Sequence, residues 1–215
     1  MARGISANGE IIYGTSWESF DFGMLYWVNN GENTAAPKWV GHDVREVVPV
    51  TMKMGDGTEY ETHLVKGCKC TAENTKVSPN GKWIATKYCE DSVSDDGISM
   101  YTSETPAFYN TETETTVIVN DYGSGSGTHV TDDGIGFIGL GSLGISSGRV
   151  YDCNTRTDLG TTQEWVYDNY GIIIPNCYVT SISPDGTVVF GRYLESSAGG
   201  HMKFPGWYVA PPVAE

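Results

Sequence analysis

Four short apolar runs recur along the chain, each directly after a polar turn sequence. They are ISANGEIIYG at 5–14, VSPNGKWIAT at 77–86, VTDDGIGFIG at 130–139 and ISPDGTVVFG at 182–191. Asn-Gly and Asp-Gly supply the positive φ angles of a tight turn, and Pro79 and Pro184 preset φ at its first corner. Each copy therefore predicts a turn that leads into a strand. Because the strand is apolar at nearly every position, we expect neighbouring sheets to cover both of its faces.

A second strand with aromatic residues is predicted downstream of each turn, followed in the first three copies by a polar turn and two weaker strands. These aromatic segments are Met24–Val28, Ala107–Asn110, Arg149–Cys153 and Gly206–Val209. The copies start 72, 53 and 52 residues apart (5 to 77, 77 to 130 and 130 to 182). A β-propeller blade takes roughly 40–50 residues plus loop insertions. The spacing thus predicts an all-β, β-propeller-like repeat of four-stranded antiparallel blades.

The repeats predict one domain, 1–215, divided at about 5–70, 72–128, 129–178 and 179–215. The last repeat holds only its first half, so about three and a half blades are expected. An unclosed propeller exposes a sheet edge and an apolar blade face, which a longer parent chain, a second copy or another partner would have to cover. The extra residues of the first copy, around Gly55-Asp56-Gly57, predict a lengthened hairpin within the first blade. Residues 123–127 (GSGSG) predict a flexible linker between blades two and three.

The turn sequences resemble those of a known family of repeats. ISPDGTVVFG and VSPNGKWIAT are similar to the S-P-D-G signature of WD40-like propeller repeats of the TolB type, and ISANGEIIYG with LYWVNNGE resembles related repeats of bacterial extracellular proteins. The third copy departs from this signature because it lacks Pro. In the second copy, Thr86 stands where the other copies have the Gly that ends the strand. The resemblance implies a bacterial binding or scaffold protein in the periplasm or at the cell surface. The first residues, MARGISANGE, contain no signal peptide.

Composition supports strands and narrows the classes of partner. The chain has 27 Gly, 13 Tyr and 6 Trp, and stretches rich in Ala, Leu or Lys are absent. Its net charge of −14 opposes binding to nucleic-acid phosphates and to anionic lipid headgroups. No stretch approaches the ~18 apolar residues of a membrane span. We therefore expect neither a nucleic-acid partner nor a membrane span.

Two sequences match catalytic or cofactor motifs but lack the structural context that those motifs require. GISSG at 144–148 fits the nucleophile elbow G-x-S-x-G around Ser146, yet a strand is predicted after it where the elbow needs a helix. GLGSLG at 139–144 fits the dinucleotide motif G-x-G-x-x-G, again without a following helix. We interpret this region as a glycine-rich hairpin loop and predict no catalytic residue.

Metal ligands are equally incomplete. The five cysteines leave one unpaired in any disulfide scheme, and Cys68-Lys-Cys70 has no second ligand pair at a spacing that suits zinc. Adjacent acidic residues such as Asp132-Asp133 leave calcium as an alternative, although no EF-hand loop is present. The four histidines are far apart in the sequence and are interpreted as surface or loop residues. We predict no cofactor and no metal site.

Aromatic residues in loop-like segments of the first copy are the remaining candidates for binding. They are Trp17, Phe20, Phe22 and Trp39. Such side chains can stack on sugar rings or anchor a protein partner, and the alternative is that they fill the space between blades.

Three functions remain open from the sequence. The favoured one is a non-enzymatic propeller module that presents loops and the inserted hairpin to a protein or carbohydrate partner. The second is a glycosidase-like or other hydrolase with paired carboxylates in the propeller channel. The third is a structural half-propeller that is completed by oligomerisation.

Overall fold

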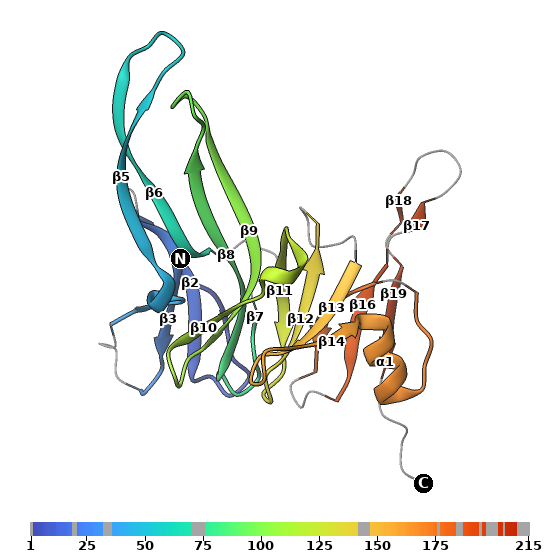
Figure 1. Ribbon diagram of the computed structural model, residues 1–215. Coiled ribbons are helices and arrows are strands. Elements are labelled where there is room, and N and C mark those ends of the chain that lie inside the picture. The colour runs from blue at the N-terminus through green and yellow to red at the C-terminus, as the bar shows by residue number, and fades with distance from the viewer. Residues whose placement is uncertain are drawn as a thin grey trace.

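Four antiparallel sheets standing side by side in chain order form the body of the protein (Figure 1). The computed structural model describes residues 2–18, 21–31, 36–69, 76–141, 147–175, 177–183, 187–193, 195–196, 202–203 and 205–209. Each sheet is one blade of a β-propeller, and the first and last sheets in chain order lie at opposite ends of the row in Figure 1. The all-β propeller fold predicted from the repeats is confirmed.

The sheets are named A to D in chain order. Sheet A holds β1 (Ala2–Ile5), β2 (Ile11–Glu18), β3 (Asp21–Val28) and β4 (Lys38–Trp39). Sheet B holds β7 (Lys76–Val77), β8 (Trp83–Val93), β9 (Met100–Asn110) and β10 (Thr115–Ile118), together with β5 (Glu46–Lys53) and β6 (Glu59–Lys69). Sheet C holds β11 (Gly125–Val130), β12 (Ile135–Leu140), β13 (Ser147–Asp152) and β14 (Thr157–Thr161). Sheet D holds β15 (Tyr178–Ile182), β16 (Val189–Arg192) and β19 (Gly206–Val209).

Short elements connect these sheets. They are the 3₁₀ turns η1 (His42–Val44) and η2 (Asn120–Tyr122), the helix α1 (Thr162–Tyr170) and a ribbon of β17 (Glu195–Ser196) with β18 (Met202–Lys203). No helix in the described ranges is long and apolar enough to cross a membrane.

The repeated Ser explains why each turn leads directly into a strand. The hydroxyl of Ser6 accepts a hydrogen bond from the backbone N–H of Ile11 at 2.9 Å, and Ser78 does the same for Trp83 at 3.0 Å. Ser183 accepts from the N–H of Val188 at 2.9 Å. These bonds replace water at the first residues of the strand, because a buried N–H needs a partner.

The turns also join one blade to the next. The side-chain amide of Asn8 donates to the carbonyl of Asn80 in the next sheet at 2.8 Å. The backbone N–H of Asn80 donates in turn to a carboxylate oxygen of Asp132 in sheet C at 2.8 Å. The Asn or Asp of the repeat therefore shapes its own turn and links neighbouring blades.

Alternate residues of each middle strand face opposite neighbours. In β8, Ile84 lies in the apolar cluster between sheets A and B, whereas Ala85 lies in the cluster between sheets B and C. In β12, Ile138 packs toward sheet B and Phe137 toward sheet D. This arrangement accounts for the continuous apolar runs, since both faces of the strand are buried.

Two predictions about connections were wrong. The hairpin β5–β6 belongs to sheet B, because β6 pairs with β8 and not with the first blade. Residues 125–127 of the expected linker 123–127 belong to the buried strand β11, Gly125–Val130. A side chain at Gly127 would collide with the carbonyl of Ala107, so this glycine serves close backbone packing and not flexibility. Each sheet begins earlier in the sequence than the predicted repeat does. The strand before each turn belongs to the same sheet as the strand after it.

Helix α1 was not predicted, because two further strands were expected in the third repeat. Thr161 begins it with a capping box: its hydroxyl accepts from the N–H of Glu164, and the Glu164 carboxylate accepts from the N–H of Thr161. The helix ends at Gly171 in the left-handed conformation. The Thr-x-x-Glu spacing is the sequence signal that could have revealed it.

Candidate functional site

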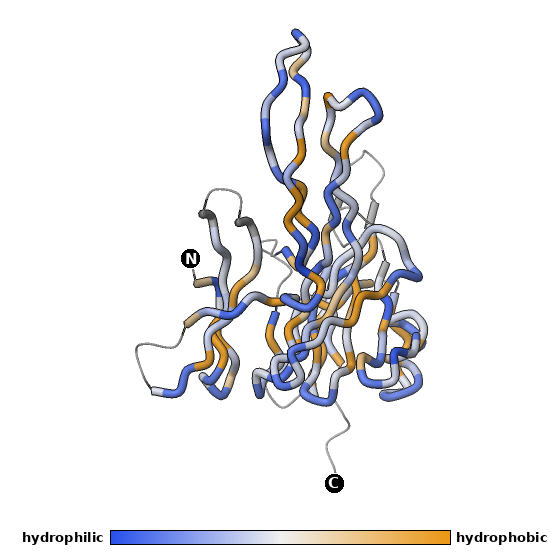
Figure 2. The backbone as a smooth tube through the Cα atoms, turned by 60° about the vertical axis from the view of Figure 1, so that its left-hand side comes forward, coloured by the Kyte–Doolittle hydropathy of each residue, from blue (hydrophilic) through white to orange (hydrophobic). Residues whose placement is uncertain are grey.

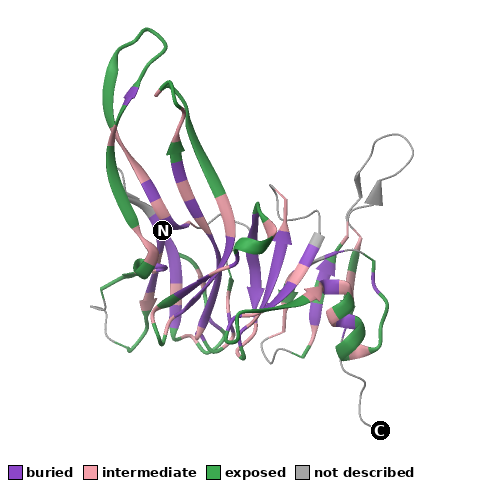
Figure 3. Ribbon diagram, viewed as in Figure 1, coloured by how far each residue is buried: buried purple, intermediate pink, exposed green. Residues whose placement is uncertain are grey.

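Apart from Ile5 and Val28 on sheet A, the large apolar side chains that are exposed in the described part of the chain lie in three groups. The first is on an arm formed by the two hairpins β5–β6 and β8–β9 where they extend beyond the propeller body, residues 47–65 and 91–103. The second lies beside helix α1, and the third is on the outer face of sheet D. Figure 3 shows the upper parts of both hairpins as exposed, in contrast to the buried strands below them.

The arm has a defined geometry. At its base, β6 pairs with β8 from Lys66 opposite Glu90 to Lys69 opposite Lys87. Beyond this ladder the hairpins separate, and at the tip the backbone N–H of Lys53 donates to the carbonyl of Gly97 at 2.9 Å. The two hairpins are therefore joined at both ends of the arm.

A buried carboxylate holds the hairpins together where the ladder ends. Asp91 accepts hydrogen bonds from the N–H of Val65 at 3.0 Å, from the Lys69 ammonium at 3.1 Å and from the Thr102 hydroxyl at 2.7 Å. Burial alone would raise the pKa of Asp91, but these hydrogen bonds outweigh it and the pKa is lowered. The carboxylate is thus ionised, and it contacts both hairpins.

The surface of the arm combines apolar and acidic side chains. Its exposed apolar residues include Met54, Tyr60, Ile98, Met100 and Tyr101. Hydrophilic residues predominate at both tips (Figure 2), and five exposed acids accompany one exposed lysine, Lys53, there. These acids are Asp56, Glu59, Glu61, Asp95 and Asp96.

Two of these acids are held in the charged form by their own turns. The backbone N–H of Thr58 lowers the pKa of Asp56, and the Ser94 hydroxyl lowers the pKa of Asp96. These two carboxylates therefore keep their negative charge at mildly acidic pH.

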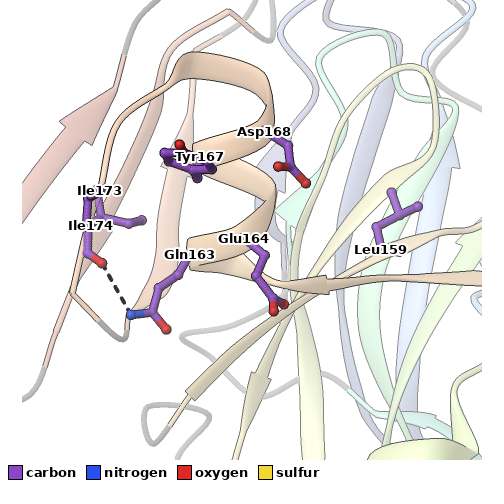
Figure 4. A pocket seen from close by; sticks show the side chains of 7 residues that line it. All are labelled: Leu159, Gln163, Glu164, Tyr167, Asp168, Ile173 and Ile174. Carbon is purple, nitrogen blue, oxygen red and sulfur yellow. Dashed lines mark hydrogen bonds between the residues drawn. The ribbon is translucent and has the colours of Figure 1, made fainter.

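A hollow of about 540 Å³ lies beside helix α1 (Figure 4). Tyr167 is 56% exposed on its rim and Ile173 is 86% exposed. Figure 4 shows Glu164 and Asp168 extending from one side of the helix toward Leu159. The Glu164 carboxylate already accepts hydrogen bonds from the backbone and hydroxyl of Thr161, which lower its pKa. A lowered pKa is the opposite of what a general acid requires.

The aromatic residues proposed for binding are only partly placed by the structure. Trp17 lies opposite Phe22 in the β2–β3 register, and Phe20 lies outside the described residues. Trp39 on β4 is half-buried, and the Arg45 guanidinium lies over its ring at 4.0 Å from the centroid. A binding role for these four residues stays a prediction.

The alternative function of a hydrolase requires paired carboxylates in the propeller channel. β1, β7, β11 and β15 are edge strands of their sheets and contact one another in this order, and their sequences ARGI, KV, GSGTHV and YVTSI contain no Asp or Glu. Hydrolysis by paired carboxylates on these strands is therefore not supported. Within the described ranges no three His, Cys, Asp or Glu residues are grouped to hold a metal ion. Ser146 and Cys70 lie outside those ranges.

His129 corrects the prediction that all four histidines lie at the surface or in loops. It lies on β11 and is only 8% exposed, and its Nδ1 is among the buried atoms without a hydrogen-bond partner. Burial lowers its pKa to about 3, helped by the nearby charge of Lys76. The imidazole is therefore neutral in the folded protein. His42 lies in η1, where its Nδ1 is 3.2 Å from the Tyr109 hydroxyl, and His201 lies outside the described residues.

His129 is expected to make the protein less stable in acid. Its pKa is about 6.5 in an unfolded chain, so the unfolded state binds more protons below that pH and stability falls as the pH drops toward 3. The loss amounts to roughly 2 kcal/mol between pH 6.5 and pH 5. Urea denaturation of the wild type and of His129→Gln across this range measures it. The variant should show a flatter dependence of stability on pH than the wild type; equal slopes for the two proteins would contradict the assignment.

Comparison with known proteins adds little to this picture. No protein-family model and no curated protein sequence matches the chain. A crystal structure of a protein from Lactobacillus plantarum is similar, with 16% sequence identity and a TM-score of 0.31 over 94% of this chain and 68% of that chain. Because this similarity is low, the propeller assignment rests on the sheets and repeats described above.

Proposed function

We propose that the protein is a non-enzymatic binding module, a β-propeller that presents the arm to a protein partner. The observation that carries this is the exposure of apolar side chains on strands that extend beyond the blade. Met100 is 50% exposed and Tyr101 is 59% exposed. Exposed apolar groups that form a patch mark interaction surfaces, and two-stranded hairpins are only marginally stable without further packing.

The chemistry of the arm favours a protein over a carbohydrate. Ile98, Met54 and Met100 are aliphatic or thioether side chains, which adapt to irregular apolar protein surfaces. Sugars instead need flat aromatic faces, and Tyr60 and Tyr101 lie on different hairpins. Since the acids of the tip outnumber its lysine, the partner surface is expected to be basic as well as apolar.

The TolB-type relationship and an extracytoplasmic location in a bacterium are part of the same proposal. They are supported by the Ser-Pro-Asn-Gly and Ser-Pro-Asp-Gly turns at 78–81 and 183–186. The hydrogen bonds made by Ser6, Ser78 and Ser183 give these turns a shared structural role.

The test is binding to arrays of short peptides and of glycans. We expect the wild type to bind peptides that alternate Lys or Arg with aliphatic residues, with an affinity that falls as the salt concentration rises. The double variant Ile98→Ser, Tyr101→Ser should bind at least tenfold more weakly. Glu59→Gln combined with Glu61→Gln should reduce the salt dependence.

A matched control replaces an equally exposed aromatic residue elsewhere. Tyr167→Ser should bind the peptides as the wild type does, because helix α1, which carries Tyr167, lies far from the hairpins of the arm (Figure 1). Loss of binding in Tyr167→Ser but not in the arm variant would place the site at the hollow beside α1. Binding to neutral glycans without peptide binding would contradict the proposal.

A further inference from the structure

The third group of exposed apolar residues follows from the register of the blades. In every sheet, one residue of the second strand lies opposite one residue of the third strand on the face toward the following blade. The four pairs are Tyr13–Tyr26, Ala85–Phe108, Phe137–Val150 and Phe190–Tyr208. The turn of each sheet joins the second strand at Ile11, Trp83, Ile135 or Val188. The first residue of each pair lies two positions after this junction. The four sheets thus present the same face in the same register.

Three of these pairs are covered by the next sheet and one is not. All six residues of the first three pairs are at most 6% exposed and lie in the clusters between adjacent sheets. In sheet D, Phe190 is 41% exposed and Tyr208 is 70% exposed, with ring centroids 6.2 Å apart. Sheet D therefore carries the face that receives a following blade, and nothing in the described part of the chain covers it.

Sheet A carries the complementary face. The pairs that face the preceding blade are one residue earlier or later in the same ladders, namely Ile12–Trp27, Ile84–Tyr109, Gly136–Tyr151 and Val189–Val209. The last three pairs are buried against their preceding sheets. Ile12 and Trp27 are apolar but only half-buried. Sheet A thus has an apolar preceding-blade face on which no sheet packs in the part of the chain that the structure describes.

We propose that the Phe190–Tyr208 face of sheet D packs against the Ile12–Trp27 face of sheet A in a second copy of the chain. The interface repeats the packing that joins sheets A to B, B to C and C to D within one chain. Two copies arranged head to tail form two such interfaces, which close a ring of eight blades. Propellers typically contain 4–8 blades, and closed symmetric assemblies are the rule for soluble oligomers.

Sedimentation velocity of the 215-residue chain, at concentrations up to about 100 μM, tests the pairing. The expected result is a species of twice the chain mass. Tyr208→Glu places a charge in the sheet D face and should weaken dimerisation at least tenfold; because Tyr208 is exposed in the single chain, the variant should fold, which near-ultraviolet circular dichroism verifies. Trp27→Glu should have the same effect through the sheet A face.

Mixing the two variants distinguishes a head-to-tail pair from other dimers. At a concentration at which neither variant dimerises alone, an equimolar mixture should still form dimers through the one interface in which both faces are intact. This mixed dimer should be weaker than the wild-type dimer, because its other interface carries both glutamates. A dimer that pairs two D faces would survive Trp27→Glu, which would overturn the proposal. Should Trp27→Glu fail to fold, Ile12→Lys takes its place. A wild type that stays a single chain at every concentration would also overturn the proposal. That result would indicate that a different chain covers the face.

The arm provides the internal control. Ile98→Ser combined with Tyr101→Ser should leave the dimer mass unchanged, since neither residue lies in sheets A or D. Peptide binding by the arm and dimerisation by the end sheets can therefore fail independently.

Discussion

Replacing Phe108 with alanine is expected to lower the free energy of unfolding by about 3–5 kcal/mol. Phe108 is fully buried in the cluster between sheets B and C. Gly127 and Gly136 both lie against its ring, and a Cβ at position 136 would overlap it. These glycines place the backbone of sheet C against the ring, so the strands cannot easily move in to fill the cavity that alanine leaves.

Urea denaturation followed by circular dichroism measures the loss. Tyr101→Ala is the matched control, because Tyr101 lies on the same strand but is exposed, and its replacement should change stability by about 0.5 kcal/mol or less. A loss of under about 1 kcal/mol for Phe108→Ala would mean that sheets B and C do not pack as described.

Replacing Asp91 with alanine is expected to cost about 3 kcal/mol, chiefly by loosening the arm. The change leaves the Lys69 ammonium and the N–H of Val65 without their acceptor, in a site where the Asp91 side chain is 6% exposed. Since Lys69 is itself 25% exposed, water can replace part of the interaction. In the variant, the backbone amides of 59–65 should consequently exchange with solvent faster than in the wild type, whereas the exchange of those in β12 should not change.

The contribution of Asp91 should depend on pH. Its pKa is lowered in the folded protein, so the stabilisation is complete above the unfolded value of about 4 and is lost as the pH falls through the folded value. Asp91→Asn keeps two acceptor bonds but removes the charge, and should lose less than Asp91→Ala. Asp95→Ala, at the exposed tip, should have no measurable effect on exchange at the base. Equal exchange rates in Asp91→Ala and the wild type would show that the carboxylate does not join the hairpins.

The elements that depend on local chemistry were predicted well. The Ser-x-Asn-Gly turns at 6–9 and 78–81 form from hydrogen bonds within a few residues, so the same letters produce the same turn wherever they occur. The aromatic segment Gly206–Val209 is a strand with the predicted bounds, because its neighbour β16 follows directly from the turn. Helix α1 depends on equally local chemistry, the capping box of Thr161 and Glu164, although strands were predicted in its place.

The candidate site could not be predicted in the same way. The residues of the inserted hairpin were identified, but its position was not, since pairing of β6 with β8 is decided by strands about twenty residues apart that compete for one sheet edge. The acidic and apolar residues of the arm come from two hairpins, which are brought together only by the contacts of Asp91 at the base and by the Lys53–Gly97 hydrogen bond at the tip. Whether a strand residue is exposed likewise cannot be predicted from the sequence of that strand.

The sequence alone determined the four turns, the strands beside them and the propeller repeat. Each of these depends on φ angles, side-chain acceptors and apolar alternation within a few residues. The tertiary structure decided which faces those strands share. Phe137 and Phe190 occupy equivalent positions in equivalent strands, yet one is buried and the other exposed. The difference lies in whether another sheet stands beside them, which is a property of the assembled sheets and of no single segment.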